Sequence, residues 1–436
     1  MKNETNNGWP PLHFMKKEWE SKAPCFSSGL HSMPRPVEWG LVLSLLIGVF
    51  VIDADAADWP GWRGADRNGI SVETNLNWKW TEKTPKTVWK TSVGIGFSSF
   101  SVADGRAYTL GNSSDVDSVY CLDAGTGREI WKHSYPSLKD PKAFEGGPLS
   151  TPIVDGNRVY TMGKFGDCFC FEAQNGKIIW SRKFDRPVRT KEDYSVWWGY
   201  AGSAVITGEK LILPVGSAGT AVDKLTGKTV WENNGSGYSG YSSPVLFNKG
   251  GRMAFSYISG HEIVAGEVDS GKVLWKTPWK TTWDQNAPDV IVSDGKLFAS
   301  TGHEVGCSLY DITGEKPVEI WRNKNMRTSL SSCVLWKGCL YGFDDRQMRC
   351  IDWKTGEVRW TASDLGWGSM ILADGKLIAL TEKGMLMAVE AAADAYTLAA
   401  SVRVLDGRCW SAPVLSRGRL YMRNAAGDAI CLDLNN

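Results

Sequence analysis

A phrase ending in tryptophan recurs along the chain and constrains its fold more than any other feature. Its clearest copy is Val222-Asp223-Lys-Leu-Thr-Gly227-Lys-Thr-Val-Trp231: an acidic residue, a glycine four positions later and a tryptophan four positions after that. Clear and weaker copies lie about 40 to 50 residues apart, the spacing of a four-stranded propeller blade. They end at Trp131, Trp180, Trp231, Trp275, Trp321 and Trp360.

A β-hairpin is predicted in each repeat, because two short apolar runs flank a tight-turn sequence such as Asp-Gly. The predicted turns lie near Asp104, Asp155, Thr207, Asn248, Asp294, Lys337, Asp374 and Arg417. Each unit is then a hairpin, a third strand ending in the acidic residue, a glycine turn and a fourth strand carrying tryptophan. The seventh unit keeps Glu390 but lacks the glycine turn and the tryptophan.

The eighth unit reaches Cys431 and Asp433 without a fourth strand, whereas the segment around Trp89 reads as a tryptophan strand with no hairpin before it. We expect this segment to complete the last blade, since closure removes the free edges of an open ring. The predicted fold is all-β: an eight-bladed β-propeller of four-stranded antiparallel blades over residues 86–436, closed by an N-terminal strand. The strand of Trp89 should then lie beside that of Cys431.

The N-terminal region, residues 1–56, reads as a secretory signal peptide, with Met33 as an alternative start. The apolar run 41–52 is too short to span a bilayer, and Ala54-Asp55-Ala56 is a small-x-small cleavage site. An uncleaved signal anchor is the alternative. We expect an exported, periplasmic or extracellular monomer with no membrane span in the mature chain.

The repeat resembles the PQQ-type repeat of eight-bladed quinoprotein propellers over roughly residues 86–436, most closely in Ala221-Val-Asp223-Lys-Leu-Thr-Gly227-Lys-Thr-Val-Trp231. The opening Asp58-Trp-Pro-Gly-Trp62-Arg63-Gly64 also resembles the start of exported bacterial propellers of this group. This resemblance implies that residues 57–85 form an arm across the ring. The family contains quinone-dependent alcohol and sugar dehydrogenases and non-catalytic, BamB-like propellers that assist outer-membrane barrel assembly. The resemblance implies a structural, blade-docking role for Trp89, Trp131, Trp180, Trp231, Trp275, Trp321 and Trp360.

A dehydrogenase of this family needs PQQ and a Ca²⁺ ion held by oxygen ligands. The nearest carboxylate–amide cluster is Asp284-Gln285-Asn286 with Asp289, a pattern more typical of a solvated loop. Adjacent cysteines and the C-x-x-C-H haem signature are absent from the sequence. His133, His261 and His303 lack metal-ligand spacing, so no metal site is predicted. We therefore predict no catalytic residues and no cofactor. PQQ with Ca²⁺ would be bound only if the protein is a dehydrogenase.

Three functions follow from these observations. The preferred one is an exported, non-catalytic binding or assembly module with an unknown envelope protein or glycan as partner. The alternative is a PQQ-dependent alcohol or sugar dehydrogenase, and the second alternative is a carbohydrate-binding propeller. A net charge of +1 without a basic run argues against a nucleic-acid partner.

The cysteines give one disulfide expectation. Four of them occupy the same third-strand position in different units and are predicted to be small buried thiols; these are Cys121, Cys170, Cys350 and Cys431. Cys333 and Cys339 flank a tight turn and form the favoured disulfide pair.

Aromatic residues recur seven positions before the predicted hairpin turns. The aligned residues are Phe97, Pro148, Tyr200, Tyr241, Ala287, Leu330, Trp367 and Trp410. Since the first strand of each blade lines the central channel, these residues should ring one channel mouth. The aromatic members form a candidate ligand or partner site; they are Phe97, Tyr200, Tyr241, Trp367 and Trp410. The alternative is that they only fill the channel.

Overall fold

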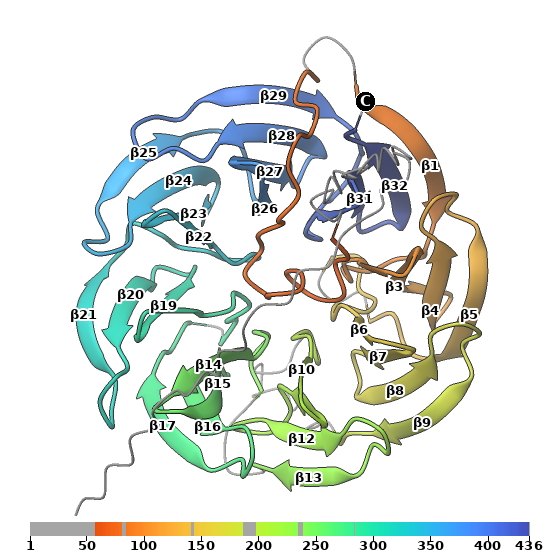
Figure 1. Ribbon diagram of the computed structural model, residues 1–436, viewed down its shortest axis with the longest axis horizontal. Coiled ribbons are helices and arrows are strands. Elements are labelled where there is room, and N and C mark those ends of the chain that lie inside the picture. The colour runs from red at the N-terminus through yellow and green to blue at the C-terminus, as the bar shows by residue number, and fades with distance from the viewer. Residues whose placement is uncertain are drawn as a thin grey trace, which may run out of the picture. The chain divides into compact units, whose positions relative to one another are not determined.

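The computed structural model describes residues 57–80, 84–140, 144–185, 198–233, 239–282 and 284–435. These residues form eight four-stranded antiparallel sheets arranged around a centre, which confirms the predicted eight-bladed propeller (Figure 1). Among them, no helix is long and apolar enough to cross a membrane. The predicted signal segment, residues 1–56, lies outside the described residues.

The first four blades follow the chain in order. Blade 1 consists of β2 (Ser101–Ala103), β3 (Arg106–Ser113), β4 (Val116–Asp123) and β5 (Glu129–Pro136). Blade 2 consists of β6 (Ile153–Asp155), β7 (Arg158–Met162), β8 (Asp167–Glu172) and β9 (Ile178–Lys183). Blade 3 consists of β10 (Val205–Thr207), β11 (Lys210–Leu213), β12 (Thr220–Asp223) and β13 (Thr229–Glu232). Blade 4 consists of β14 (Val245–Lys249), β15 (Arg252–Ile258), β16 (Glu262–Glu267) and β17 (Val273–Pro278).

The last four blades complete the ring. Blade 5 consists of β18 (Ile291–Ser293), β19 (Lys296–Thr301), β20 (Gly306–Asp311) and β21 (Val318–Asn323). Blade 6 consists of β22 (Val334–Trp336), β23 (Cys339–Asp344), β24 (Gln347–Asp352) and β25 (Val358–Ala362). Blade 7 consists of β26 (Gly368–Ala373), β27 (Lys376–Thr381), β28 (Met385–Glu390) and β29 (Leu398–Arg403). Blade 8 consists of β30 (Val414–Ser416), β31 (Arg419–Arg423), β32 (Asp428–Asp433) and β1 (Lys86–Ser92).

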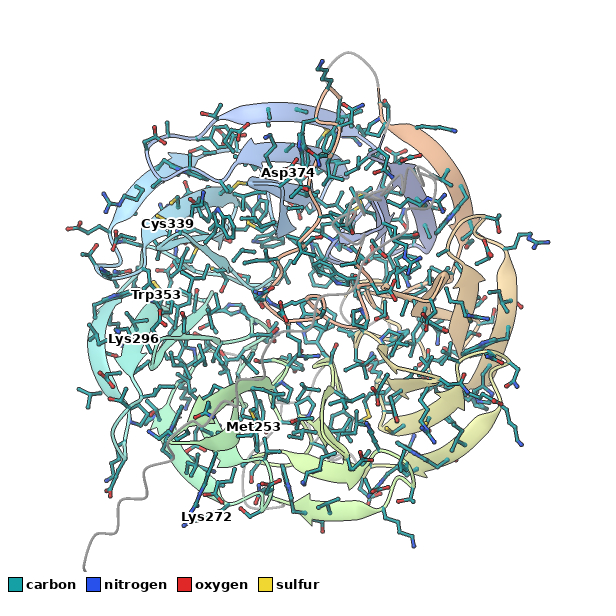
Figure 2. The ribbon with its side chains drawn as sticks, in the orientation of Figure 1. Met253, Lys272, Lys296, Cys339, Trp353 and Asp374 are labelled. Atoms are coloured by element: carbon teal, nitrogen blue, oxygen red, sulfur yellow. The ribbon has the colours of Figure 1, made fainter. Side chains whose placement is uncertain are left out.

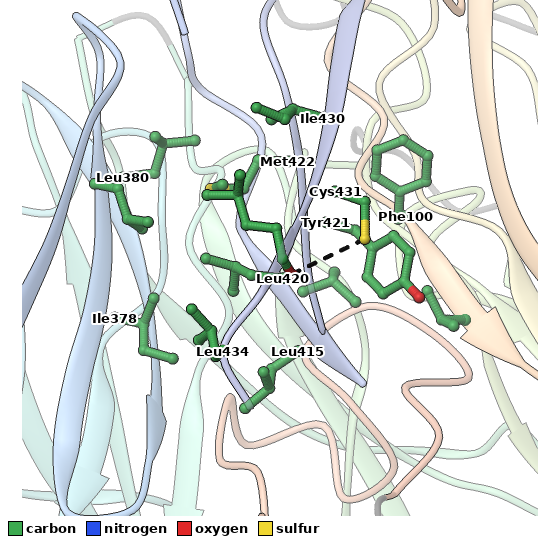
Figure 3. Packing of buried hydrophobic residues seen from close by; sticks show 14 of the residues in the cluster. Phe100, Ile378, Leu380, Leu415, Leu420, Tyr421, Met422, Ile430, Cys431 and Leu434 are labelled. Atoms are coloured by element: carbon green, nitrogen blue, oxygen red, sulfur yellow. Dashed lines mark hydrogen bonds between the residues drawn. The ribbon is translucent and has the colours of Figure 1, made fainter. Parts of the chain in front are cut away.

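Strand β1 closes the ring by pairing with β32. Trp89 lies opposite Cys431 in this antiparallel ladder, as the sequence predicts. The buried cluster beside the closure includes Phe100 from blade 1 and Tyr421 from blade 8, together with Cys431 (Figure 3). The first and last parts of the propeller therefore share both a sheet and a hydrophobic core.

The repeated acidic turn explains how neighbouring blades dock. The Asp223 carboxylate accepts hydrogen bonds from the backbone of Leu225 and Thr226, which stabilises the turn. Gly227 follows with a φ of 72° and lies so close to Trp180 of the preceding blade that a Cβ atom would come within 2.7 Å of the indole. Glycine is needed here both for the backbone conformation and for the approach of the ring.

Most of the repeat tryptophans donate an indole hydrogen bond to a carbonyl in the next blade's turn. The acceptors are Ala124 for Trp89 (3.0 Å), Ala173 for Trp131 (2.9 Å), Lys224 for Trp180 (3.0 Å), Val268 for Trp231 (2.9 Å), Trp353 for Trp321 (3.3 Å) and Ala392 for Trp360 (2.8 Å). Trp275 is also buried, but its indole nitrogen has no hydrogen-bond partner in the described chain. The Ile312 carbonyl, at the equivalent turn position of the next blade, instead accepts a hydrogen bond from the ammonium group of Lys249.

Blade 7 lacks this tryptophan, and the N-terminal arm takes its place. Ala400 occupies the tryptophan position opposite Ala388. At the next turn, the Leu434 carbonyl, which would face a docking indole, accepts the backbone N–H of Asn77 at 2.7 Å. Trp80 donates its indole N–H to the Asn77 carbonyl at 2.6 Å and is buried in the same cluster as Leu434.

The rest of the arm crosses the propeller at the hairpin-turn ends of the inner strands (Figure 1). Trp59 pairs with Val102 of blade 1, and Ile70 forms a β-bridge with Leu372 of blade 7. The Glu73 carboxylate accepts backbone hydrogen bonds from the turn of blade 8. The arm thus connects blades 7, 8 and 1, on either side of the ring closure, and covers this end of the channel.

The described cysteines are all free and buried, so the predicted Cys333–Cys339 disulfide is wrong. The two-residue turn at Lys337 and Gly338 pairs Trp336 directly with Cys339. Cys333 lies three residues before Trp336, outside this ladder, and its sulfur lies near Gly342. Cys339 is the first residue of β23 in blade 6 (Figure 2).

Candidate functional site at the channel mouth

A belt of hydrogen bonds links successive blades just before their inner strands. In each link, a backbone N–H donates to a hydroxyl or carboxylate oxygen at the equivalent position of the next blade. The links are Ser99 to Thr151 (3.2 Å), Thr151 to Ser203 (2.9 Å), Ser203 to Ser243 (3.0 Å), Ser243 to Asp289 (2.7 Å) and Asp289 to Ser332 (2.9 Å). The sequence analysis missed this belt, although its signal is a small hydroxyl residue two positions before the inner strand of many blades.

The residue two positions before each belt position lines a cavity of about 310 Å³ at the mouth opposite the hairpin turns. All eight blades contribute to its wall. These wall residues are Phe97, Leu149, Ala201, Tyr241, Ala287, Leu330, Trp367 and Trp410. The structure therefore brings four of the five aromatic candidates, all except Tyr200, into one site.

Tyr200 lies one residue out of register and points into the blade core. Its side chain is buried, and its hydroxyl donates to the Asp185 carbonyl at 3.0 Å. The turn of blade 3 begins after Thr207, which pairs with Lys210, so the alignment position is displaced by one residue. Because side chains alternate in an extended chain, this displacement exchanges a cavity position for a core position.

The same displacement affects blade 2. Asp155 pairs with Arg158 as the last residue of its strand, so the turn begins at Gly156 rather than at the aspartate of the Asp-Gly pair. Leu149 consequently lines the cavity in place of Pro148.

Two further aromatic side chains come from inter-blade loops. Phe144 and Trp198 stack with their ring centroids 5.6 Å apart, and Phe144 also contacts Trp410 at 4.7 Å. Phe97 stacks on Trp410 at 5.4 Å, and Trp367 meets Trp410 edge-on at 5.9 Å. The sequence analysis missed Phe144, because the loop position bears no relation to the repeat.

The arm supplies the floor of the cavity. Trp62 lines it, and the indole N–H of Trp62 donates to the Asp289 carboxylate at 2.6 Å. Behind Trp62, Arg63 donates to the Cys333 carbonyl at 2.7 Å and Arg67 donates to the Ala204 carbonyl at 2.9 Å. Burial lowers the pKa of Arg67 to about 10, while the Asp289 carboxylate opposes this shift, so the guanidinium stays charged at neutral pH.

The lining itself carries no Asp, Glu, Lys or Arg among the described residues. Its polar side chains are Ser203, Ser243, Ser329, Ser411, Gln285 and His303. Burial lowers the pKa of His303, so its imidazole is neutral at neutral pH. The cavity is therefore an uncharged aromatic pocket with hydroxyl and amide groups.

The side chains in and beside this cavity do not fit PQQ with Ca²⁺. An anionic quinone requires cationic partners, and Ca²⁺ requires several oxygen ligands that normally include carboxylates. Asp289 is engaged by Trp62 and Ser243, and the buried Asn286 donates to the Gly260 carbonyl at 2.7 Å. No cluster of three metal-binding His, Cys, Asp or Glu residues occurs in the described part of the chain.

The fold and this site define a closed eight-bladed propeller with a ligand-sized aromatic cavity at one channel mouth. A family model described as outer membrane protein assembly factor BamB matches residues 115–362, more than half of the chain. The chain therefore belongs to this family of PQQ-like, BamB-type propellers.

Relatives and solved structures of similar fold lie at low identity. The outer membrane protein assembly factor BamB of Burkholderia pseudomallei is 23% identical over 56% of this chain and 60% of its own length, so the match spans less than two thirds of that relative. The BamB of Escherichia coli is 21% identical over 70% of this chain and 89% of its own length.

Two crystal structures illustrate the fold. BamB from Moraxella catarrhalis has a TM-score of 0.59 and 14% identity, with 80% of this chain and 100% of that chain covered. A europium-containing methanol dehydrogenase has a TM-score of 0.64 and 13% identity, with 84% and 90% covered. At these identities the likeness shows the fold alone.

Proposed function

We propose that this protein is an exported, non-catalytic binding module of the cell envelope, working as a monomer in the periplasm or outside the cell. It belongs to the BamB-type family, and the relatives it matches are named as outer membrane assembly factors. The aromatic cavity at the channel mouth, with Phe97, Tyr241, Trp367 and Trp410 in its wall, would hold a ligand or a segment of an envelope partner.

The single observation that supports this function is the composition of the cavity. Every blade contributes a wall residue, the arm closes the floor, and none of the described lining residues is Asp, Glu, Lys or Arg. Rigid aromatic rings give large contact areas at low entropic cost, which suits binding. The described lining supplies no carboxylate, either as a base or as a ligand for Ca²⁺, so the pocket favours binding over quinone chemistry.

The dehydrogenase alternative is supported by the fold likeness to quinoprotein structures such as the methanol dehydrogenase. It is tested by adding PQQ and Ca²⁺ to the purified protein and recording the absorption spectrum and alcohol-dependent dye reduction. The binding function predicts no stoichiometric chromophore and no turnover. Saturable quinone binding with turnover would refute the non-catalytic proposal.

The binding site is tested by photo-crosslinking in the native cell. A photoreactive residue at Leu330, in the cavity wall, should form adducts with one envelope component, and these adducts should be lost in the Phe97→Ala/Trp410→Ala double variant. The same probe at Val318, which is 64% exposed on the outer strand of blade 5, is the control. Equal adducts from both positions, unaffected by the double variant, would place the interaction elsewhere.

A further inference from the structure

We infer that the channel-mouth cavity binds an uncharged saccharide, with a pyranose ring stacked among its aromatic side chains. This inference deepens the proposed binding function and rests on it, since it names the chemical class of ligand for the same site.

The charge of the pocket selects an uncharged ligand. The lining residues that the structure describes include no Asp, Glu, Lys or Arg, and His303 is neutral. Two described guanidinium groups stack on wall aromatics from outside the lining: Arg408 on Phe144 and Trp410 at 4.4 and 4.8 Å, where Glu145 holds it in an ion pair, and Arg346 on Trp367 at 5.0 Å. Among the described lining residues, a charged ligand inside the cavity would therefore lose hydration without gaining an ionic partner.

Hydroxyl groups on the ligand would satisfy the polar side chains of the pocket. Within the described part of the chain, no hydrogen bond engages the side chains of Gln285, Ser329 or His303, all of which line the cavity. The Ser203 and Ser243 hydroxyl oxygens accept the belt N–H groups and keep their own O–H groups available as donors. This set combines amide, imidazole and hydroxyl groups, which can pair with both the donor and the acceptor of a sugar hydroxyl.

The aromatic walls fit the remaining surface of such a ligand. A pyranose presents C–H groups on its faces and hydroxyls around its rim, so one ring stacks on an aromatic plane while the rim reaches polar groups. Trp62 is fixed by its bond to Asp289, and the Trp367 indole N–H is fixed by Asp345 at 2.9 Å. Both indoles are thus held in place before a ligand arrives, which reduces the entropic cost of binding.

The volume of the cavity sets the size of the ligand. About 310 Å³ corresponds to roughly ten water molecules at about 30 Å³ each. This space accommodates one or two sugar residues and lies at the small end of ligand pockets.

The test is a titration of the purified protein with neutral sugars, followed by tryptophan fluorescence and calorimetry. The probes are glucose, galactose, mannose and maltose, with glucuronic acid and glucosamine as charged analogues. We expect saturable binding of at least one neutral sugar, and at least tenfold weaker binding of its charged analogue. Absence of saturable binding by every neutral sugar up to about 100 mM, above the millimolar range of weak ligands, would overturn the inference.

Variants locate the binding in the cavity. Trp367→Ala should weaken binding by at least tenfold, and Gln285→Ala by about fivefold, the equivalent of one net hydrogen bond. Trp336→Ala, a matched tryptophan change at the hairpin end of blade 6, should leave affinity unchanged. Equal affinity in Gln285→Ala, Trp367→Ala and the parent would contradict the assignment.

Different outcomes identify the source of the sugar and distinguish failure of the saccharide inference from failure of the proposed binding function. A tenfold gain from glucose to a longer neutral glucan would identify a glycan chain, and equal affinity would identify a free sugar; both results support the inference. If no sugar binds but the Leu330 crosslinks persist and depend on Phe97 and Trp410, the saccharide inference fails and the binding function stands. If sugar binds only when PQQ and Ca²⁺ are present and is turned over, both fail.

Discussion

Removal of Trp80 should open the seam between blades 7 and 8, because the arm replaces the docking tryptophan that blade 7 lacks. Trp80 is only 2% exposed and contacts the cluster that contains Leu434. Truncation to alanine exposes about 200 Å² of apolar ring surface, and at about 25 cal/mol per Å² the upper limit of the loss is about 5 kcal/mol. We expect Trp80→Ala to lower the free energy of unfolding by about 3–5 kcal/mol, in line with other buried aromatic truncations.

The measurement is equilibrium denaturation of the two proteins in guanidinium chloride, monitored by far-ultraviolet circular dichroism. Trp131→Ala, at a regular blade junction, should cost a similar amount. Val72→Ala, an arm residue that is 65% exposed, is the control and should change stability by less than about 0.5 kcal/mol. A Trp80→Ala loss no larger than that of Val72→Ala would refute the view that the arm holds this seam.

Three further predictions test the turns, the half-buried His133 and the thiols. Gly227→Ala should lower the free energy of unfolding by about 1–3 kcal/mol more than Gly105→Ala does. Both glycines have a φ of 72°, but only at Gly227 would the added Cβ atom meet an indole, at 2.7 Å. Equal losses of stability in thermal unfolding would contradict this. His133 packs against aromatic rings and burial lowers its pKa, so the unfolded chain binds its proton more readily and stability is lost as pH falls below about 6.5. Its replacement in His133→Gln should flatten the dependence of the melting temperature on pH between about 7 and 5, and an unchanged slope would count against the argument. In the mature chain expected from Ala57, all nine cysteines should resist Ellman's reagent until denaturation, because they are buried; rapid labelling of the native protein would disprove their burial.

The repeat could be predicted from the sequence because each part of it is a local signal. An acidic residue, a glycine with positive φ and an apolar strand ending in tryptophan define a turn and an edge strand wherever they occur. Counting the predicted hairpins leads to eight blades, and the surplus strand at Trp89 leads to its pairing with Cys431. The four repeated third-strand cysteines were likewise predicted as buried thiols and are buried.

Which residues form the wall of the cavity depends on the register of each hairpin, and a local turn sequence fixes this register less firmly than it fixes the presence of a turn. An Asp-Gly pair reads the same in blades 1 and 2, yet the turn begins one residue later relative to that pair in blade 2. This single step moved the predicted wall from Leu149 to Pro148, and the equivalent step in blade 3 moved it from Ala201 to Tyr200. The disulfide expectation failed for a related reason, since proximity to a turn does not place Cys333 opposite Cys339.

Taken alone, the amino-acid order determined the number of blades and their strand order, because hydrogen bonding within each unit is local and repeated. It also determined the closure of the ring, because the surplus strand at Trp89 matches the strand that the last unit lacks. Only the folded chain decided what fills the channel and the seam. Phe144, Trp62 and Asn77 reach their positions from a loop and an arm whose contacts join residues more than two hundred positions apart. Such contacts depend on the assembled ring, and no period in the sequence encodes them.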